Sequence, residues 1–163
     1  VLEDLLLAER LPVFAKRASR DMATHPKFFF FDVGVYRTLR PKGPIDRPEE
    51  IDSAALGALL FQELRALNED HDLEYKFYFW RTQKKVEVDL VAYGERGLIA
   101  FEVKRTAKLR REDLTGLKAF KELYPEARCL MLHGGKDRFR DAGIEGIPVE
   151  FAITNLRQLL VQR

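Results

Sequence analysis

The spacing of apolar and polar residues predicts one long helix followed by three strands. In residues 51–70 leucines recur at helical intervals, and Asp52 or Ser53 supplies the N-cap. The leucines of this stripe are Leu56, Leu60, Leu64 and Leu67. Three strands without a helix between them are predicted next, at residues 74–81, 85–93 and 97–105. The polar segments TQKK and GERG that separate these strands are short enough for hairpin loops.

The C-terminal part of the pattern completes an α/β domain. A second helix is predicted over 111–125, where Pro125 stops it. Two further strands and a closing helix capped by Thr154 or Asn155 are predicted at 127–134, 146–153 and 154–163. The order helix, three strands, helix, strand predicts a mixed central sheet flanked by helices, in which antiparallel hairpins are joined to a crossover strand.

The N-terminal part has a weaker pattern. We expect a short helix over residues 1–9 and a basic connector, interrupted by proline, over 10–27. The aromatic run FFFF that follows is expected to be a buried strand, with its turn at Asp32 and Gly34. The chain starts in mid-pattern with VLEDLLLAERLPVF, which indicates a piece of a longer protein.

Composition bounds the class of protein without identifying a partner. The chain has 163 residues, of which 46% are apolar and 33% charged, with a formal net charge of +2. This length suffices for one domain with a buried core. A single cysteine, Cys129, excludes a disulfide framework and a cysteine-built zinc site, so we expect a cytoplasmic protein. No apolar run approaches the ~20 residues that span a bilayer, so no membrane partner is expected.

Acidic residues interrupt two of the predicted strands, where a buried strand would not be expected to carry them. Because side chains alternate between faces along a strand, Glu87 and Asp89 are expected on one face and their apolar neighbours on the other. The same alternation applies to Glu102 and Lys104. The apolar residues on the opposite faces are Val86, Val88 and Leu90 in one strand and Phe101 and Val103 in the other. If the strands pair as a hairpin, three carboxylates and an ammonium gather on one face.

A fourth acid, Glu63, is expected to point at the same place. It lies beside the leucine stripe that faces the sheet, where a carboxylate is costly unless it has a partner. Two or three carboxylates with room for water suit Mg²⁺ or Mn²⁺. A lysine beside such an ion stabilises negative charge or orients a metal-bound water. This combination suits hydrolysis of a phosphodiester.

The two strands carry a motif that is familiar from nucleases. VEVD and FEVK, in which Asp89 and Glu102 are thirteen residues apart, resemble the PD-(D/E)xK pattern of the restriction-endonuclease-like superfamily. Val88 stands where that pattern has proline. Glu63 takes the place of the superfamily's helical acid, and the order of elements resembles its αβββαβ core.

A narrower resemblance covers most of the chain. The succession from KFFFFDVGVYRTL through YFWRTQKKVEVDLVAY to DLTGLKAF resembles the C-terminal domain of a group of bacterial and archaeal AAA+ ATPases, where it follows a winged-helix segment. In this interpretation residues 1–22 are the tail of the winged-helix part, residues 23–163 are the restriction-endonuclease-like domain, and the ATPase module lies upstream. The chain itself has no P-loop motif, so we do not expect it to bind ATP through one.

The resemblance implies a metal-dependent nuclease that acts on DNA, with Mg²⁺ or Mn²⁺ as cofactor. It makes Asp89 and Glu102 the metal ligands, with the carbonyl of Val103 as a third ligand. Lys104 would orient or polarise the attacking water, and Glu63 would bind a second ion or hold a water. The implied partners are DNA and the ATPase module of the same polypeptide. A second copy of the chain is a separate alternative, in which the apolar segment VLEDLLLAERLPVF forms an oligomer contact.

Several alternatives stay open. The superfamily includes members that bind without cutting, so the alternative function is a non-catalytic module that binds DNA or assembles the ATPase. An exposed ion pair is the alternative interpretation of Glu102 and Lys104, and Glu87 is interpreted as a solvated partner of Lys84 or Lys85. The basic residues after the second motif suit phosphate contacts or a solvated face: Lys104, Arg105, Lys108, Arg110 and Arg111.

The aromatic strand over 74–81 allows two interpretations as well. Phe77 and Phe79 are expected on one face and Tyr78 and Trp80 on the other, which is the pattern of a strand buried on both faces. The alternative is a platform on which nucleic acid bases stack. We favour the buried strand.

Overall fold

A computed structural model of the chain describes residues 8–16, 25–30, 32, 34, 35, 38, 43 and 48–161. The strands are β1 (Ala8–Leu11), β2 (Lys27–Phe30), β3 (Lys76–Arg81), β4 (Glu87–Gly94), β5 (Gly97–Lys104), β6 (Arg128–His133), β7 (Phe139–Asp141) and β8 (Ile144–Pro148). The helices are α2 (Pro48–Asp70), a 3₁₀ turn (Arg111–Leu114), α3 (Thr115–Leu123), α4 (Val149–Thr154) and α5 (Leu156–Val161).

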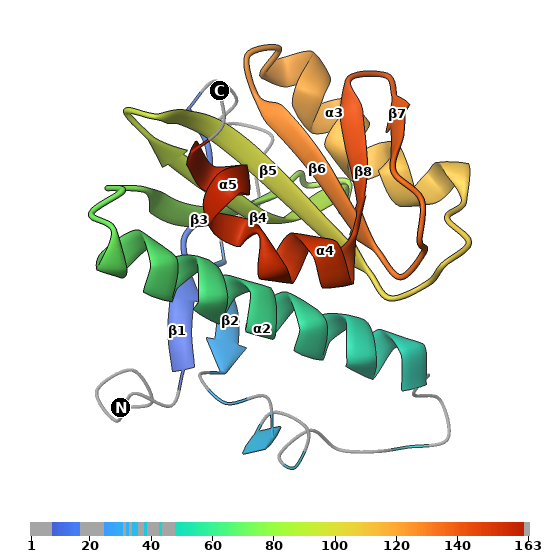
Figure 1. The fold of residues 1–163 in the computed structure, drawn as a ribbon, viewed down its shortest axis with the longest axis horizontal. Coiled ribbons are helices and arrows are strands. Elements are labelled where there is room, and N and C mark those ends of the chain that lie inside the picture. The colour runs from blue at the N-terminus through green and yellow to red at the C-terminus, as the bar shows by residue number, and fades with distance from the viewer. Residues whose placement is uncertain are drawn as a thin grey trace.

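A six-stranded mixed sheet forms the centre of the molecule (Figure 1). Its strand order is β3-β4-β5-β6-β8-β7. The strands β3, β4 and β5 are antiparallel neighbours, whereas β6 runs parallel to both β5 and β8. The helix α3 connects β5 to β6 as the crossover between parallel strands. The predicted α/β class, and the order helix, three strands, helix, strand, are confirmed.

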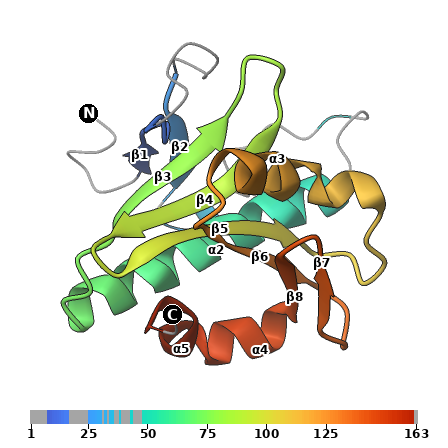
Figure 2. The ribbon, with the colours of Figure 1, turned by 90° about the horizontal axis from the view of Figure 1, so that it is seen from above.

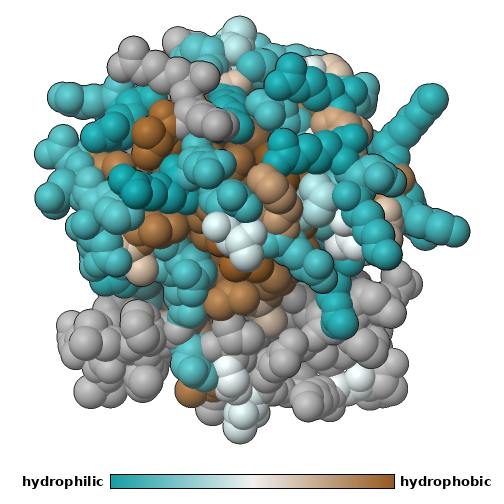
Figure 3. Space-filling view, in the orientation of Figure 1, coloured by the Kyte–Doolittle hydropathy of each residue, from teal (hydrophilic) through white to brown (hydrophobic). Residues whose placement is uncertain are grey.

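Helices cover both faces of this sheet, and each face has its own apolar core (Figure 2). The first core joins the sheet to α2, α4 and α5, through Leu64, Phe101 and Leu156 among others. The second core joins the opposite face to α3, through Trp80 and Phe120 among others. Figure 3 shows the surface in the orientation of Figure 1, and on this face patches of apolar residues lie between polar ones. Among the described helices, none has the length and apolarity needed to cross a membrane.

The strand β3 is buried on both faces, as its aromatic alternation predicts. Phe79 belongs to the core beneath α2, with Phe77 packed against it, whereas Trp80 belongs to the core beneath α3, with Tyr78 packed against it. Phe79 and Trp80 are each 2% exposed, so they cannot serve as a stacking platform at the surface.

A β-bulge interrupts β4, and the sequence pattern did not predict it. Tyr78 pairs with Val91 and Trp80 with Val88, so a step of two residues on β3 faces a step of three on β4. The extra residue breaks the alternation of faces. Val88 therefore packs in the core beneath α3 while Leu90 packs in the core beneath α2, and the expectation that both share one face is wrong.

Two predicted elements also differ from the structure. Residues 1–7 lie outside the described residues, but Ala8 and Glu9 belong to β1, so the predicted helix over 1–9 does not extend that far. The predicted strand over 146–153 ends at Pro148, and the residues after it form α4. Apolar and β-branched residues suggested a strand here. The segment instead forms a short helix that buries Ala152 against the core beneath the sheet.

The ends of the helices differ from prediction in detail. The helix α2 begins at Pro48, before the predicted caps Asp52 and Ser53. Asn155 donates its side-chain amide to the carbonyl of Phe151, 2.9 Å away, and so satisfies the end of α4 rather than capping α5. The three-residue strand β7 was not predicted, because its sequence has no apolar alternation.

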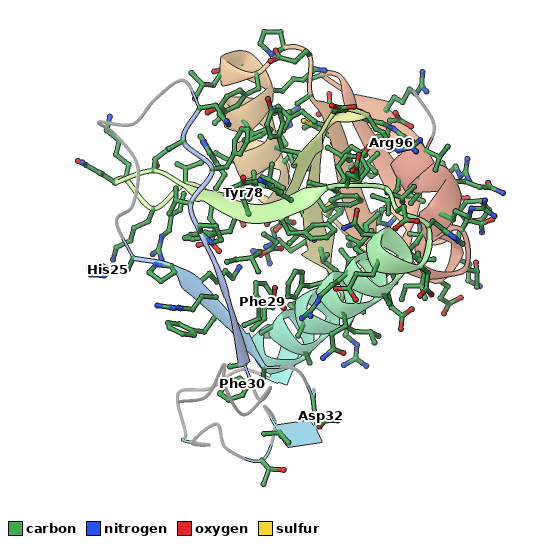
Figure 4. All side chains as sticks on the ribbon, turned by 90° about the vertical axis from the view of Figure 1, so that its left-hand side faces the viewer. His25, Phe29, Phe30, Asp32, Tyr78 and Arg96 are labelled. Atoms are coloured by element: carbon green, nitrogen blue, oxygen red, sulfur yellow. The ribbon has the colours of Figure 1, made fainter. Side chains whose placement is uncertain are left out.

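Two strands outside the central sheet form an arm, which we define as residues 8–14 and 27–30. β1 and β2 pair antiparallel, and the arm lies beside the β3 edge of the sheet (Figure 2). The amide of Phe14 donates to the carbonyl of Phe79 at 2.8 Å, and the amide of Phe79 donates to the carbonyl of Pro12 at 3.1 Å. On the other strand of the arm, Phe29 lies against α2, with its ring 5.1 Å from that of Phe61 (Figure 4). The arm is thus fixed both to the sheet edge and to α2.

Candidate functional site

Three of the four acids singled out in the sequence, Glu87, Asp89 and Glu102, lie where β4 begins and β5 ends. The two strands are antiparallel, so Glu87 at the start of β4 and Lys104 at the end of β5 lie at the same edge of the sheet. A lysine from the arm completes this group. The ammonium Nζ of Lys27 lies 2.7 Å from Oε1 of Glu87 and 3.2 Å from Oδ1 of Asp89. Both acids therefore share one cation.

Asp89 has a donor on each of its two carboxylate oxygens. Oδ1 accepts from Lys27, and Oδ2 accepts from the backbone amide of Val103 at 3.1 Å. This second bond joins β4 to β5 just beyond the last regular pair, Leu90 with Phe101. The side chain of Asp89 is consequently held in place at the position where the bulge interrupts β4.

A pocket of about 310 Å³ lies beside Asp89. The polar groups on its wall are Lys27, Asp89, Lys104 and Ser53, and α2 and β2 supply most of the remaining wall. Phe28 also lines this pocket and is 56% exposed, so the predicted burial of the aromatic run fails at this residue. The pocket is large enough for several water molecules and for a small anionic group.

Glu102 is the most unusual group of the site because its carboxyl is buried in the sheet. It is 8% exposed, and its Oε1 lies 3.1 Å from Nζ of Lys104. Among the described residues Oε2 has no hydrogen-bond partner. Burial, followed by the negative charge of Asp89, raises the pKa of Glu102 to about 8, although Lys104 acts in the opposite direction. The carboxyl thus favours its protonated form at neutral pH.

The two lysines have the opposite behaviour and stay charged. Burial acts to lower the pKa of Lys27, but the charges of Asp89 and Glu87 outweigh it and raise that pKa above its ordinary value. Lys104 is affected in the same way. Burial acts against its charge, whereas Glu102 and then Asp89 raise its pKa. The site therefore contains two ammonium groups among three carboxyls.

The carboxyls approach the site from different sides, which corrects the expectation of a single common face. Asp89 lines a pocket with Ala58 of α2, on the side where Leu90 is buried. Glu102 lies towards α3, since a Cβ placed on Gly116 would be 3.6 Å from its Oε2. The bulge is the physical reason, because it moves Asp89 out of register with the side chains opposite it on β5.

Glu63 is not brought to this site, and the expectation that it points there is wrong. Its side chain is exposed, and it lines a separate pocket of about 620 Å³ between the arm and α2. The reason lies in the buried face of α2. Ala58 and Phe61 are buried together with Leu60 and Leu64, which shifts this face away from Glu63. The leucine stripe alone suggested a narrower face, centred nearer to this acid.

Lys27 was missed by the sequence analysis, because its role depends on where the arm packs. The only local signal is a lysine immediately before an aromatic strand. Glu87 was interpreted as a solvated partner of Lys84 or Lys85, whereas its contacts are Lys27 and, with Nε 3.6 Å from its Oε2, Arg81. The basic residues that follow β5 are exposed, which both of their interpretations require: Lys108, Arg110 and Arg111.

The site has some of the features of a metal centre and lacks others. An unpartnered carboxylate oxygen in a buried position, such as Oε2 of Glu102, is costly and suits a cation. A second carboxylate, that of Asp89, is close enough to affect its pKa. However, the described part of the chain contains no group of three or more His, Cys, Asp or Glu side chains arranged to hold a metal ion. The donor set fits a hard divalent ion that keeps most of its water, provided that Lys27 moves away from Asp89.

Comparison with known proteins gives a family for the chain. No curated protein and no solved structure is significantly similar to it. One family model matches residues 54–152, which make up more than half of the chain and run from α2 to α4 through the whole central sheet. The matched segment includes Asp89, Glu102 and Lys104 but not Lys27. The chain belongs to the family described as Domain of unknown function (DUF4143).

Proposed function

We propose that this chain is a nuclease domain that hydrolyses phosphodiester bonds in DNA with the help of Mg²⁺ or Mn²⁺. The observation that carries the proposal is the buried carboxyl of Glu102, which lies 3.1 Å from Nζ of Lys104 and whose pKa is raised by burial and by the charge of Asp89. Carboxyls with strongly shifted pKa values and a charged partner in a cleft are typical of catalytic sites. The motif resemblance and the order of the strands point the same way.

In this proposal Asp89 and Glu102 hold the ion, together with the carbonyl of Val103. The ion supplies a bound water of lowered pKa and neutralises charge on the scissile phosphate. The amide of Val103 orients the carboxylate of Asp89 through the 3.1 Å hydrogen bond. Lys104 lines the pocket and stays protonated, so its ammonium is in position to stabilise negative charge on a phosphate there.

We also propose that the domain works as part of a larger ATPase protein. DUF4143 domains are found in AAA-ATPase-associated proteins, and the sequence resemblance suggests the same arrangement. In this arrangement the nuclease domain follows an ATPase module in one cytoplasmic polypeptide. The exposed basic residues after β5 then provide contacts to DNA phosphates near the site.

DNA cleavage tests the nuclease proposal. The wild-type chain, Asp89→Asn and Lys104→Met are incubated with supercoiled plasmid and with end-labelled single- and double-stranded oligonucleotides, with Mg²⁺, Mn²⁺ or EDTA. Lys76→Met is the matched control, because Lys76 is exposed at the opposite end of β3. We expect metal-dependent cleavage by the wild type and the control and none by the two site variants, with circular dichroism confirming that all four are folded. Equal cleavage by Asp89→Asn would refute the assignment.

A non-catalytic DNA-binding module is the second candidate, and one observation favours it. Lys27 neutralises Asp89 directly, as in a site that has a structural ion pair instead of a metal ion. This candidate predicts that DNA binding, measured by fluorescence anisotropy, is the same with Mg²⁺ and with EDTA and survives Asp89→Asn. Loss of binding in Asp89→Asn, or a strong dependence on Mg²⁺, would exclude it.

A further inference from the structure

We propose that Lys27 is the resident cation of the candidate site, and that a divalent ion binds to Asp89 only after it has displaced the ammonium of Lys27. This inference rests on the proposed function, since it concerns how the same carboxylates exchange one cation for another. It adds a residue that lies outside the DUF4143 match and outside the αβββαβ order of the central sheet.

The position of the ammonium supports this role. Nζ of Lys27 is within 3.2 Å of both Glu87 and Asp89, and it contacts the oxygen of Asp89 that the backbone amide of Val103 leaves free. A metal ion bound through that oxygen would occupy the same space as the ammonium. One oxygen cannot be a close ligand of both cations in this arrangement, because the two positive charges would repel each other at contact distance.

The surroundings allow Lys27 to leave without disrupting the fold. Its side chain is 29% exposed and lines the pocket of about 310 Å³ beside Asp89, which gives the ammonium a place to move. The ring of Phe29 lies 5.3 Å from Nζ and offers a cation–π contact. The two acids keep partners as well. Asp89 keeps the amide of Val103, and Glu87 keeps Arg81.

The arm itself has other attachments and does not depend on this ion pair. Phe14 is 1% exposed and bonded to the backbone of β3 through Phe79, and Phe29 packs on Phe61. Exchange of cations at Asp89 is therefore a movement of one side chain rather than a detachment of two strands. We infer that Lys27 lowers the metal affinity of the site, so that half-filling requires a higher concentration of the ion than it would without this lysine.

Metal titration of variants at position 27 tests the inference. Mn²⁺ is titrated by calorimetry into the wild-type chain, Lys27→Met, Lys27→Arg and the matched control Lys76→Met. If Lys27 competes with the ion, Lys27→Met should bind Mn²⁺ roughly fivefold more tightly than the wild type, which corresponds to the upper end of the range for a partly exposed ion pair. Lys27→Arg retains a competing charge and should stay near the wild-type affinity, as should Lys76→Met.

A second measurement detects displacement in the wild type and does not require a variant to fold. The chain is treated briefly with an amine acetylating reagent, with and without saturating Mg²⁺, and the modification of each lysine is quantified by mass spectrometry. We expect the modification of Lys27 to rise several-fold with Mg²⁺, because the displaced amine is no longer held against the two carboxylates and becomes more accessible to the reagent. Modification of Lys76 should not change.

The outcomes separate this inference from the proposed function. Tighter binding by Lys27→Met, together with faster modification of wild-type Lys27, supports displacement. Equal affinity of the wild type and Lys27→Met, or unchanged modification of Lys27 at saturating metal, refutes the inference and leaves the nuclease proposal intact. If the wild type and the folded Lys27→Met both fail to bind any divalent ion, the metal-dependent function itself is refuted.

Discussion

Replacing Glu102 by glutamine should remove a loss of stability that the wild-type protein undergoes as the pH rises. The glutamine amide has nearly the shape of the protonated carboxyl, so the change leaves the packing at the end of β5 nearly intact. What it removes is the ability to ionise. In the folded chain the pKa of Glu102 is raised to about 8, from an ordinary value of 4.5, mainly by burial. This difference ties the free energy of unfolding to pH.

The sign and size of the effect follow from proton linkage. Below pH 4.5 the carboxyl is protonated in both the folded and the unfolded chain, and it contributes no pH dependence. Between 4.5 and about 8 the unfolded chain releases the proton while the folded chain keeps it, so the free energy of unfolding falls as pH rises. Integrating over this window gives a loss on the order of 3 kcal/mol between pH 5 and pH 7.5.

Urea denaturation measures this loss directly. Unfolding of the wild type and of Glu102→Gln is followed at several pH values by the fluorescence of Trp80, the single tryptophan of the chain. All other titrating groups are common to both proteins, so the difference between the two curves isolates Glu102. We expect the variant to gain stability relative to the wild type steadily from pH 5 to 7.5. Parallel curves would show that the carboxyl ionises at an ordinary pKa and would refute the burial argument.

Three packing predictions can be checked by the same denaturation assay. Gly116→Ala should cost about 1 to 3 kcal/mol, because a Cβ there would lie 1.9 Å from a backbone carbonyl of β4, whereas Gly57→Ala meets nothing within 4 Å and should be neutral or stabilising. Asn68→Ala should cost about 1 to 3 kcal/mol, since its side chain bonds both the amide and the carbonyl of Tyr75. Gly57→Ala, in the same helix, is the control: an equal loss of stability in both variants would show that any change in α2 destabilises the chain, and would refute the role of these two bonds. Phe14→Ala should cost about 3 to 5 kcal/mol because its ring is 1% exposed among other aromatic rings, and a loss below 1 kcal/mol would show that the arm is not part of the core.

The fold was largely predictable because its strongest signals are local. The leucines of α2 and the aromatic alternation of β3 each follow the period of one element, and both elements form where the sequence places them. The segment after Pro148 was misassigned because a short apolar run suits a buried strand and a short helix equally well. Neighbouring elements decide between the two, and the sequence pattern does not contain that information.

The site was predictable only as far as single strands determine it. Asp89, Glu102 and Lys104 lie close together on the paired strands β4 and β5, but the prediction that their side chains share one face is wrong. The side from which each carboxyl approaches was not predictable, because the bulge arises from the pairing of β4 with β3 and not from the residues of β4 alone. Lys27 reaches the site from sixty residues earlier in the chain, which is a purely tertiary contact.

The bulge makes the length of β4 as important to this site as its composition. An insertion or deletion of one residue in a loop is usually tolerated, because the loop absorbs the change. Deletion of Val88 would instead restore a regular ladder between β3 and β4 and place Asp89 opposite Trp80, on the face of its strand that Val91 occupies. Every motif letter would still be present in the shortened chain, yet its aspartate would point towards α3, away from the lysine of the arm. Sequence searches that score the motif without the spacing of its flanking valines will therefore accept proteins whose sites are built differently.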